Sequence, residues 1–284
     1  MVQPRVLILR APGTNCDGET AHAFSLSGGR TEVLHINRLL EQPSLCNQHQ
    51  ILCIPGGFSF GDDIASGRIF ANLIRHHLAD AMREFRAAGK LILGICNGFQ
   101  VLINSGILLE DDRRHGPPAT LAWNRSGRFE DRWVQLKTDG SKCVFLAGID
   151  SMYLPIAHGE GRFAARSPDV LDDLDHAGQL VLRYTASDPS RVRQVRADAP
   201  PQDPATSTTS VLKAPQTLVP YPENPNGAER DVAGVCDPTG RIFGLMPHPE
   251  RHVDPSQHPR WTRGEARTPG DGLRVFANAV AYFR

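Results

Sequence analysis

Cys96 is the residue whose surroundings point most clearly to chemistry. It lies in the segment Leu91–Gln100, where an apolar run is followed by Gly-x-Cys-x-Gly and then by helical spacing. This order is typical of a nucleophile elbow, in which glycines two residues to either side relieve a sharp strand-to-helix turn. The start of the helix favours a thiolate over a thiol. The alternative is a buried structural cysteine, and the rival thiol Cys16 lacks the elbow pattern.

His248 and Glu250 are the best candidates for a base and the carboxylate that orients it. They follow a strand-like run in the segment Met246–Glu250, which reads Met-Pro-His-Pro-Glu. Alternate residues of an extended segment project to the same side, and the two prolines restrict the backbone. A nucleophilic thiol needs such a pair to be activated. The alternative is a proline-rich turn with two surface polar residues.

Backbone amides that could hold an oxyanion are predicted at Gly57, Phe58 and Asn97. The run Ile51–Ile54 ends in Pro-Gly-Gly-Phe, and the carboxyl ends of parallel strands are where sites assemble. We therefore expect the glycine loop to face Cys96, although Pro-Gly-Gly is also an ordinary turn. The chain shows no ligand spacing of a zinc site and no phosphate-binding loop, so we expect no metal in this chain.

The elements around these residues alternate between strands and helices. Short apolar runs are candidate strands, and helical spacing separates them; the strands are Arg5–Arg10, Thr31–Ile36, Gln50–Ile54 and Leu91–Ile95, and the helices are Gly67–Phe85 and Asn97–Asn104. Strands that are apolar along their whole length indicate a mostly parallel sheet with helices on both faces. We therefore predict a doubly wound α/β fold of the flavodoxin-like type.

The second half is richer in strands. The candidates are Trp133–Leu136, Tyr153–Ile156, Gln179–Tyr184, Asp231–Cys236 and Arg241–Met246, followed by a closing helix at Gly272–Tyr282. Prolines, serines and threonines dominate residues 185–222, which we interpret as an inserted surface loop. We expect residues 1–284 to form a single domain that contains this insertion.

Composition excludes several classes of protein. The chain has 284 residues, of which 40% are hydrophobic, and its 31 basic and 31 acidic residues cancel. This balance argues against nucleic-acid binding or an anionic membrane surface. The sequence shows neither an apolar run of about 20 residues nor a signal-peptide pattern, so we predict a cytoplasmic location. The six scattered cysteines are interpreted as reduced thiols.

Taken together, these motifs resemble the class I glutamine amidotransferases. Within them, the chain is most similar to the glutaminase component of phosphoribosylformylglycinamidine synthase. The resemblance covers nearly the whole chain, and the supporting segments are Pro12–Asp17, Pro55–Asp62, Cys96–Gln100, Ile156–Gly161, Asn224–Gly227 and Met246–Arg251. The set is far more specific than any one of its members.

The resemblance implies roles for individual residues. Cys96 would be the nucleophile, His248 the base and then the acid, and Glu250 the orienting group. The amides of Gly57 or Phe58 and of Asn97 would hold the oxyanion, and the residues expected to bind glutamine are Gln100, His158 and Gly159.

The resemblance also implies a partner. Glutamine would be hydrolysed to glutamate, and ammonia would pass to a synthetase subunit that uses ATP and magnesium to convert formylglycinamide ribonucleotide to its amidine in purine biosynthesis. The chain itself would need no cofactor. The insertion and the segment Pro255–Asp271 differ from compact relatives, which leaves the need for a small bridging subunit open. The alternatives are a stand-alone cysteine amidohydrolase, a subunit that serves another acceptor, or a non-catalytic sensor.

Overall fold

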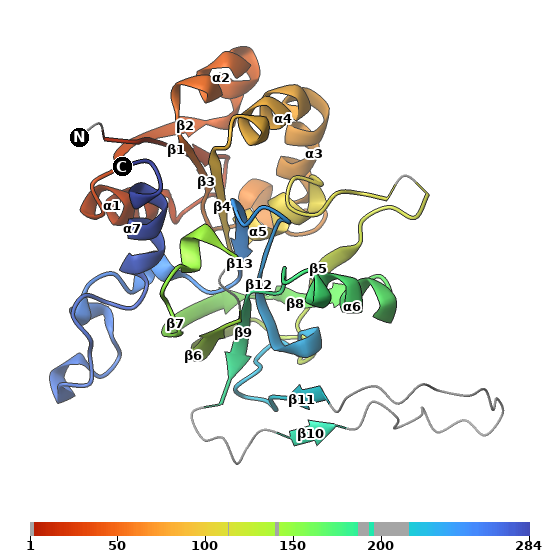
Figure 1. Ribbon diagram of the computed structural model, residues 1–284, viewed down its shortest axis with the longest axis vertical. Helices are drawn as coiled ribbons and strands as arrows, with labels where there is room; N and C mark the ends of the chain where they lie inside the picture. The colour runs from red at the N-terminus through yellow and green to blue at the C-terminus, as the bar shows by residue number, and fades with distance from the viewer. Residues whose placement is uncertain (1–2, 113, 140–141, 187–192, 196–215) are drawn as a thin grey trace.

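A nine-stranded sheet organises the chain (Figure 1). The computed structural model describes residues 3–112, 114–139, 142–186, 193–195 and 216–284. The sheet has the order β2-β1-β3-β4-β13-β12-β9-β6-β7. Its strands are β1 (Arg5–Arg10), β2 (Arg30–His35), β3 (Ile51–Ile54), β4 (Leu91–Ile95), β6 (Glu130–Thr138), β7 (Ser151–His158), β9 (Leu182–Thr185), β12 (Val232–Cys236) and β13 (Ile242–Leu245).

The sheet has a parallel and an antiparallel half. Strands β2, β1, β3, β4 and β13 pair parallel with one another. From β13 onwards, the pairs β13–β12, β12–β9, β9–β6 and β6–β7 are antiparallel. Every residue of β3 and β4 is buried, because helices cover both faces of the parallel half. The predicted α/β fold is therefore confirmed, as are all the strands predicted for the sheet, within a few residues at their ends.

Seven α-helices lie within the described residues: α1 (Asp17–Leu26), α2 (Ile36–Glu41), α3 (Arg68–His77), α4 (Ala79–Ala87), α5 (Asn97–Asn104), α6 (Pro168–His176) and α7 (Leu273–Ala281). The single helix predicted for 67–85 is wrong in one respect, because it is divided at Leu78. That residue leaves helical geometry, with φ −120° and ψ 8°, and is buried between the two halves. In the part of the chain described, no helix has both the length and the apolar character needed to cross a membrane.

Short elements complete the fold. Two small antiparallel sheets pair β5 (Ala119–Trp123) with β8 (Glu160–Ala165) and β10 (Arg193–Val195) with β11 (Gln216–Leu218). The 3-10 helices are η1 (Pro43–Gln48), η2 (Ser59–Asp62), η3 (Val144–Leu146), η5 (Glu229–Asp231), η6 (Pro249–Arg251), η7 (Pro255–Gln257) and η8 (Trp261–Arg263). Most of the insertion predicted at 185–222 lies outside the described residues, and its two ends meet the core near β9 and β11.

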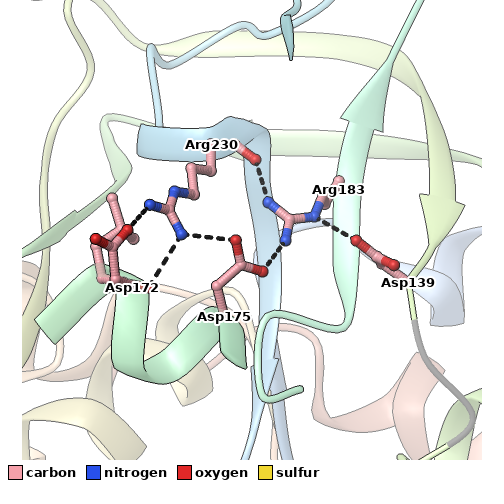
Figure 2. Close-up of polar contacts among 6 residues, drawn as sticks. Asp139, Asp172, Asp175, Arg183 and Arg230 are labelled. Atoms are coloured by element: carbon pink, nitrogen blue, oxygen red, sulfur yellow. Dashed lines mark hydrogen bonds and ion pairs between the residues drawn. The ribbon is translucent and has the colours of Figure 1, made fainter. Parts of the chain in front are cut away.

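An ion-pair network fastens α6 to the antiparallel half of the sheet (Figure 2). Arg183 of β9 donates to Asp139 at 2.8 Å and to Asp175 of α6 at 2.6 Å. Arg230 of η5 reaches the other oxygen of Asp175 at 2.6 Å and also pairs with Asp172. The two arginine side chains are only 12% and 11% exposed, so these pairs are screened less than surface pairs. The network fixes the sheet at the point where the insertion leaves it.

Candidate active site

Cys96 occupies a strained turn between β4 and α5. Its φ is +51° and its ψ is −107°, a conformation that few residues other than glycine adopt. A Cβ on Gly98 would lie 1.8 Å from the carbonyl oxygen of Ile54, and one on Gly94 would lie 2.6 Å from the carbonyl oxygen of Gly98. Both glycines are therefore required by close backbone approach, and the predicted elbow geometry is confirmed.

His248 and Glu250 lie beside that turn. The Nδ1 of His248 donates to the Oε1 of Glu250 at 2.6 Å, and both side chains are buried. A Cβ placed on Gly56 would lie 2.8 Å from the Cε1 of His248 and 3.4 Å from the Cβ of Cys96. The three residues follow β4 and β13, which pair directly, while Gly56 follows β3. The carboxyl ends of β4 and β13 thus bring a thiol, an imidazole and a carboxylate together, and the loop after β3 lies against them.

The surroundings of His248 favour its protonated form. Burial alone would lower the pKa of this imidazole, but the Glu250 carboxylate and Cys96 raise the pKa well above its ordinary value. Its Nε2 has no hydrogen-bond partner among the residues described. The ring is therefore available to hold a proton beside the thiol and to release it to a bound molecule.

The glycine loop offers one free amide rather than two. The N–H of Phe58 donates to the carbonyl of Gly13 at 2.9 Å, so in this structure it does not face the site. Within the described ranges, no acceptor is found for the N–H of Gly57 or for that of Asn97. A Cβ on Gly57 would meet the backbone nitrogen of Asn15 at 2.7 Å, which explains why a glycine is needed there.

The side chains of Asn97 and Gln100 are largely occupied. The amide of Asn97 donates to Asp62 at 3.2 Å and to Gln100 at 3.0 Å, and its oxygen accepts from the N–H of Ser59 at 3.3 Å. Gln100 in turn donates to the carbonyl of Glu160. The two residues therefore connect α5, the helix that follows the elbow, to the η2 turn and to β8.

His158 presents an unpaired ring nitrogen near the triad. Its Nδ1 lies 3.1 Å from the Oδ1 of Asn124, which also accepts from the N–H of Gly161 at 3.2 Å. Because that oxygen can only accept, Nδ1 carries the proton and Nε2 is left as an acceptor without a partner in the described structure. Burial, and then the charge on His248, lower the pKa of His158 to about 3. The neighbouring Gly159 accepts from the N–H of Asn124 through its carbonyl at 2.9 Å.

Cys16 lies closer to the site than its sequence context suggested. Its Sγ is 3.2 Å from the point where a Cβ on Gly56 would stand, and it accepts from the guanidinium of Arg251 at 3.2 Å. Burial raises the pKa of Cys16 to about 11, so it is a neutral thiol. The signal that could have located it is its place just after β1, at the same carboxyl edge of the sheet. All six cysteines are unpaired and buried.

A cation is poorly suited to this cluster. Ligand-type atoms of Cys16, His248 and Glu250 lie within 4.8 Å of one another. However, the Arg251 guanidinium already contacts the thiol, and the carboxylate is bonded to the imidazole. A positive neighbour and a protonated thiol both oppose metal binding, since the metal ligand is the thiolate.

A family model and several relatives match this chain. The model described as "CobB/CobQ-like glutamine amidotransferase domain" matches residues 3–214 and 206–283. A protein of Dehalococcoides mccartyi named phosphoribosylformylglycinamidine synthase subunit PurQ is 45% identical, and the match covers 100% of this chain and 99% of that protein. A protein of Methanococcus maripaludis with the same name is 41% identical, over 99% and 98% of the two chains.

Solved structures agree with the fold. The structure described as PurLQS from Thermotoga maritima matches with a TM-score of 0.68 and 28% identity, over 100% of both chains. The glutaminase domain of Trypanosoma brucei CTPS with bound acivicin matches with a TM-score of 0.53 over 99% of this chain and 94% of that chain. Its identity of 12% means that this second match shows only the fold.

Proposed function

The chain belongs to the CobB/CobQ-like glutamine amidotransferase family, and we propose that it is the glutaminase subunit of a phosphoribosylformylglycinamidine synthase. The observation that carries the proposal is the full-length match, at 45% identity, to a protein named as that subunit. The site geometry supports the proposal, because a thiol, an imidazole and a carboxylate converge in the order that amide hydrolysis needs.

Hydrolysis begins after the Cys96 thiol has transferred its proton to His248. The sulfur attacks the side-chain amide carbon of glutamine, and the carbonyl oxygen gains the negative charge. The N–H groups of Gly57 and Asn97 are the proposed donors to that oxygen, since neither is committed to another described residue. Phe58 is left out of this role because its N–H is bonded to Gly13.

Ammonia leaves when the intermediate collapses. His248 gives its proton to the departing nitrogen, and a thioester remains on Cys96. Water then adds to the thioester with His248 as base, which releases glutamate and restores the thiol. Glu250 keeps the proton on Nδ1 in the neutral ring and stabilises the imidazolium. The acceptor Nε2 of His158 is the proposed partner for an N–H of the bound glutamine, and Gly159 and Gln100 are proposed to contact the same substrate.

The ammonia acceptor lies in a partner. We propose a synthetase subunit that uses ATP and magnesium and binds formylglycinamide ribonucleotide, with a small bridging subunit as a third component, in the cytoplasm. The name PurLQS of the matched Thermotoga maritima structure supports an assembly of this kind. No cofactor is assigned to this chain, since the proposed hydrolysis requires only the side chains and amides already described.

The test is glutamate release from glutamine by the purified chain, alone and with the synthetase, ATP and formylglycinamide ribonucleotide. We expect release to be slow alone, to rise with the synthetase, and to disappear in Cys96→Ala. Cys46→Ala is the matched control, because Cys46 is a buried thiol in η1. A rate of glutamate release that does not change when the synthetase is added would indicate a stand-alone amidohydrolase instead. Full activity in Cys96→Ala would refute the role of Cys96 as nucleophile.

A further inference from the structure

A second cavity of about 280 Å³ lies between β7 and the segment from His252 to Asp271. It is formed partly by Tyr153 of β7 and by His258, which follows η7. No member of the Cys96–His248–Glu250 triad lines it. The cavity is of the size that holds a small metabolite, and nothing in the proposed glutamine chemistry uses it.

His252 is a buried residue in the wall of the cavity. The side chain is buried, with 1% of the residue exposed, and its Nδ1 lies 2.8 Å from the carbonyl oxygen of Tyr153. Because a carbonyl only accepts, Nδ1 carries the proton and Nε2 is an acceptor, which has no partner in the described part of the chain. Burial lowers the pKa of His252, which favours the neutral ring. The ring therefore forms part of the buried wall of the cavity rather than a contact for a ligand.

The charged groups around the cavity are balanced. Arg260 pairs with Glu265 at 3.2 Å, and Arg267 lies 3.7 Å from Asp271. All four line the cavity and supply equal numbers of positive and negative groups. A phosphate or a nucleoside triphosphate would meet two carboxylates that repel it, whereas a zwitterion satisfies both signs at once.

Aromatic rings form a firm wall behind the polar groups. Trp133 packs 5.1 Å from the rings of both Tyr153 and His252, and His258 lies 5.4 Å from Tyr153. Asp271 also accepts from the backbone N–H of Tyr153 at 2.8 Å, which ties the segment to β7. Packed rings and a fixed carboxylate hold the cavity open and suit a short aliphatic stem.

We infer that this cavity is a binding site for a free α-amino acid. The ammonium group faces Asp271 or Glu265, and the carboxylate faces Arg260 or Arg267. This arrangement matches each charge of the ligand to a lining charge of opposite sign.

The inference is tested by calorimetric titration after the glutamine pocket has been filled covalently with 6-diazo-5-oxo-L-norleucine. The probes are L-glutamine, L-glutamate and glycine, each titrated separately, with ATP and inorganic phosphate for comparison. We expect at least one amino acid to bind with one-to-one stoichiometry. Arg260→Gln should weaken this binding at least about tenfold, whereas Arg263→Gln, on the same η8 turn but outside the lining, should leave it within about twofold.

Three outcomes would overturn the inference. They are the absence of amino-acid binding up to about 10 mM, binding of phosphate or ATP in place of the amino acids, and equal effects of Arg260→Gln and Arg263→Gln. Glu265→Gln serves as a second variant, since this exposed side chain can change without unfolding the chain. Covalent labelling of Cys96 tests the proposed glutaminase separately. A failure of amino-acid binding can therefore be distinguished from a failure of the proposed function.

Discussion

Replacement of Glu250 by glutamine is the sharpest test of the catalytic geometry. The substitution keeps the shape of a fully buried side chain but removes its charge and allows the new amide to donate to Nδ1 of His248. The proton of the neutral ring would then move to Nε2, which faces the thiol and must be free to accept. A comparable change in a Ser-His-Asp triad costs about 10⁴-fold in kcat. We expect a loss of about 10³–10⁴-fold in kcat/KM, or about 4–5.5 kcal/mol of transition-state stabilisation.

The assay is glutamate release with the synthetase present, measured against pH. Loss of the carboxylate also lowers the pKa of His248, since Glu250 is a main cause of its upward shift. Alkylation of Cys96 by iodoacetamide at neutral pH should therefore slow as well. Glu110→Gln is the matched control, because Glu110 is an exposed glutamate that pairs with Arg86 at 3.3 Å. A Glu250→Gln enzyme within about tenfold of the parent rate would refute the orienting role.

Three further changes test the framework. Gly98→Ala places a Cβ 1.8 Å from the carbonyl oxygen of Ile54 and should lower the free energy of unfolding by about 3 kcal/mol. Gly18→Ala in α1, where a Cβ meets open space, should not destabilise the protein. Thermal unfolding of the two variants and the parent measures the difference. Burial raises the pKa of Asp231 to about 6, so the folded protein favours the protonated carboxyl more than the unfolded chain does. The stability that this preference contributes is fully present below about pH 4 and is lost as the pH rises through about 6. In Asp231→Asn, the free energy of unfolding measured with urea should no longer fall between about pH 4 and pH 7. The fall that is removed should be about 2 kcal/mol or less, after allowance for solvent screening. Arg230→Met should cost about 1–3 kcal/mol, because the partly buried Asp172 and Asp175 each lose one ion pair. The exposed Arg38→Met should cost under about 0.5 kcal/mol.

The elbow was predictable because its cause is local. Gly94 and Gly98 are required by contacts within one strand-turn-helix unit and its neighbouring strand, and the same spacing is visible in the sequence. The buried strands β3 and β4 were predictable for a similar reason, since strands covered on both faces must be apolar throughout. Sequence patterns report such short-range requirements directly.

Contacts between distant segments were not predictable. The Phe58 amide is taken by Gly13 because two loops, after β1 and after β3, meet at one edge, and no local pattern records that pairing. Cys16 lies beside the triad for the same reason. Strand β5 was missed because it alternates buried and exposed residues over only five positions and has few large apolar side chains. Leu78 ends a helix through its own backbone geometry, without a glycine or proline to mark the break.

His248 and the second cavity depend on the same strand, β7. The N–H of His248 donates to the carbonyl of Pro155 at 2.9 Å, and the ring of His252 donates to the carbonyl of Tyr153, two residues earlier on β7. A ligand that shifts His252 therefore acts on a strand that also positions His248. If such a ligand changes the affinity of the site for glutamine by some factor, glutamine must change the affinity of the cavity by the same factor. Calorimetry of the amino acid with and without the covalent glutamine analogue measures that factor directly, and a ratio of one would mean that β7 holds both segments without coupling them.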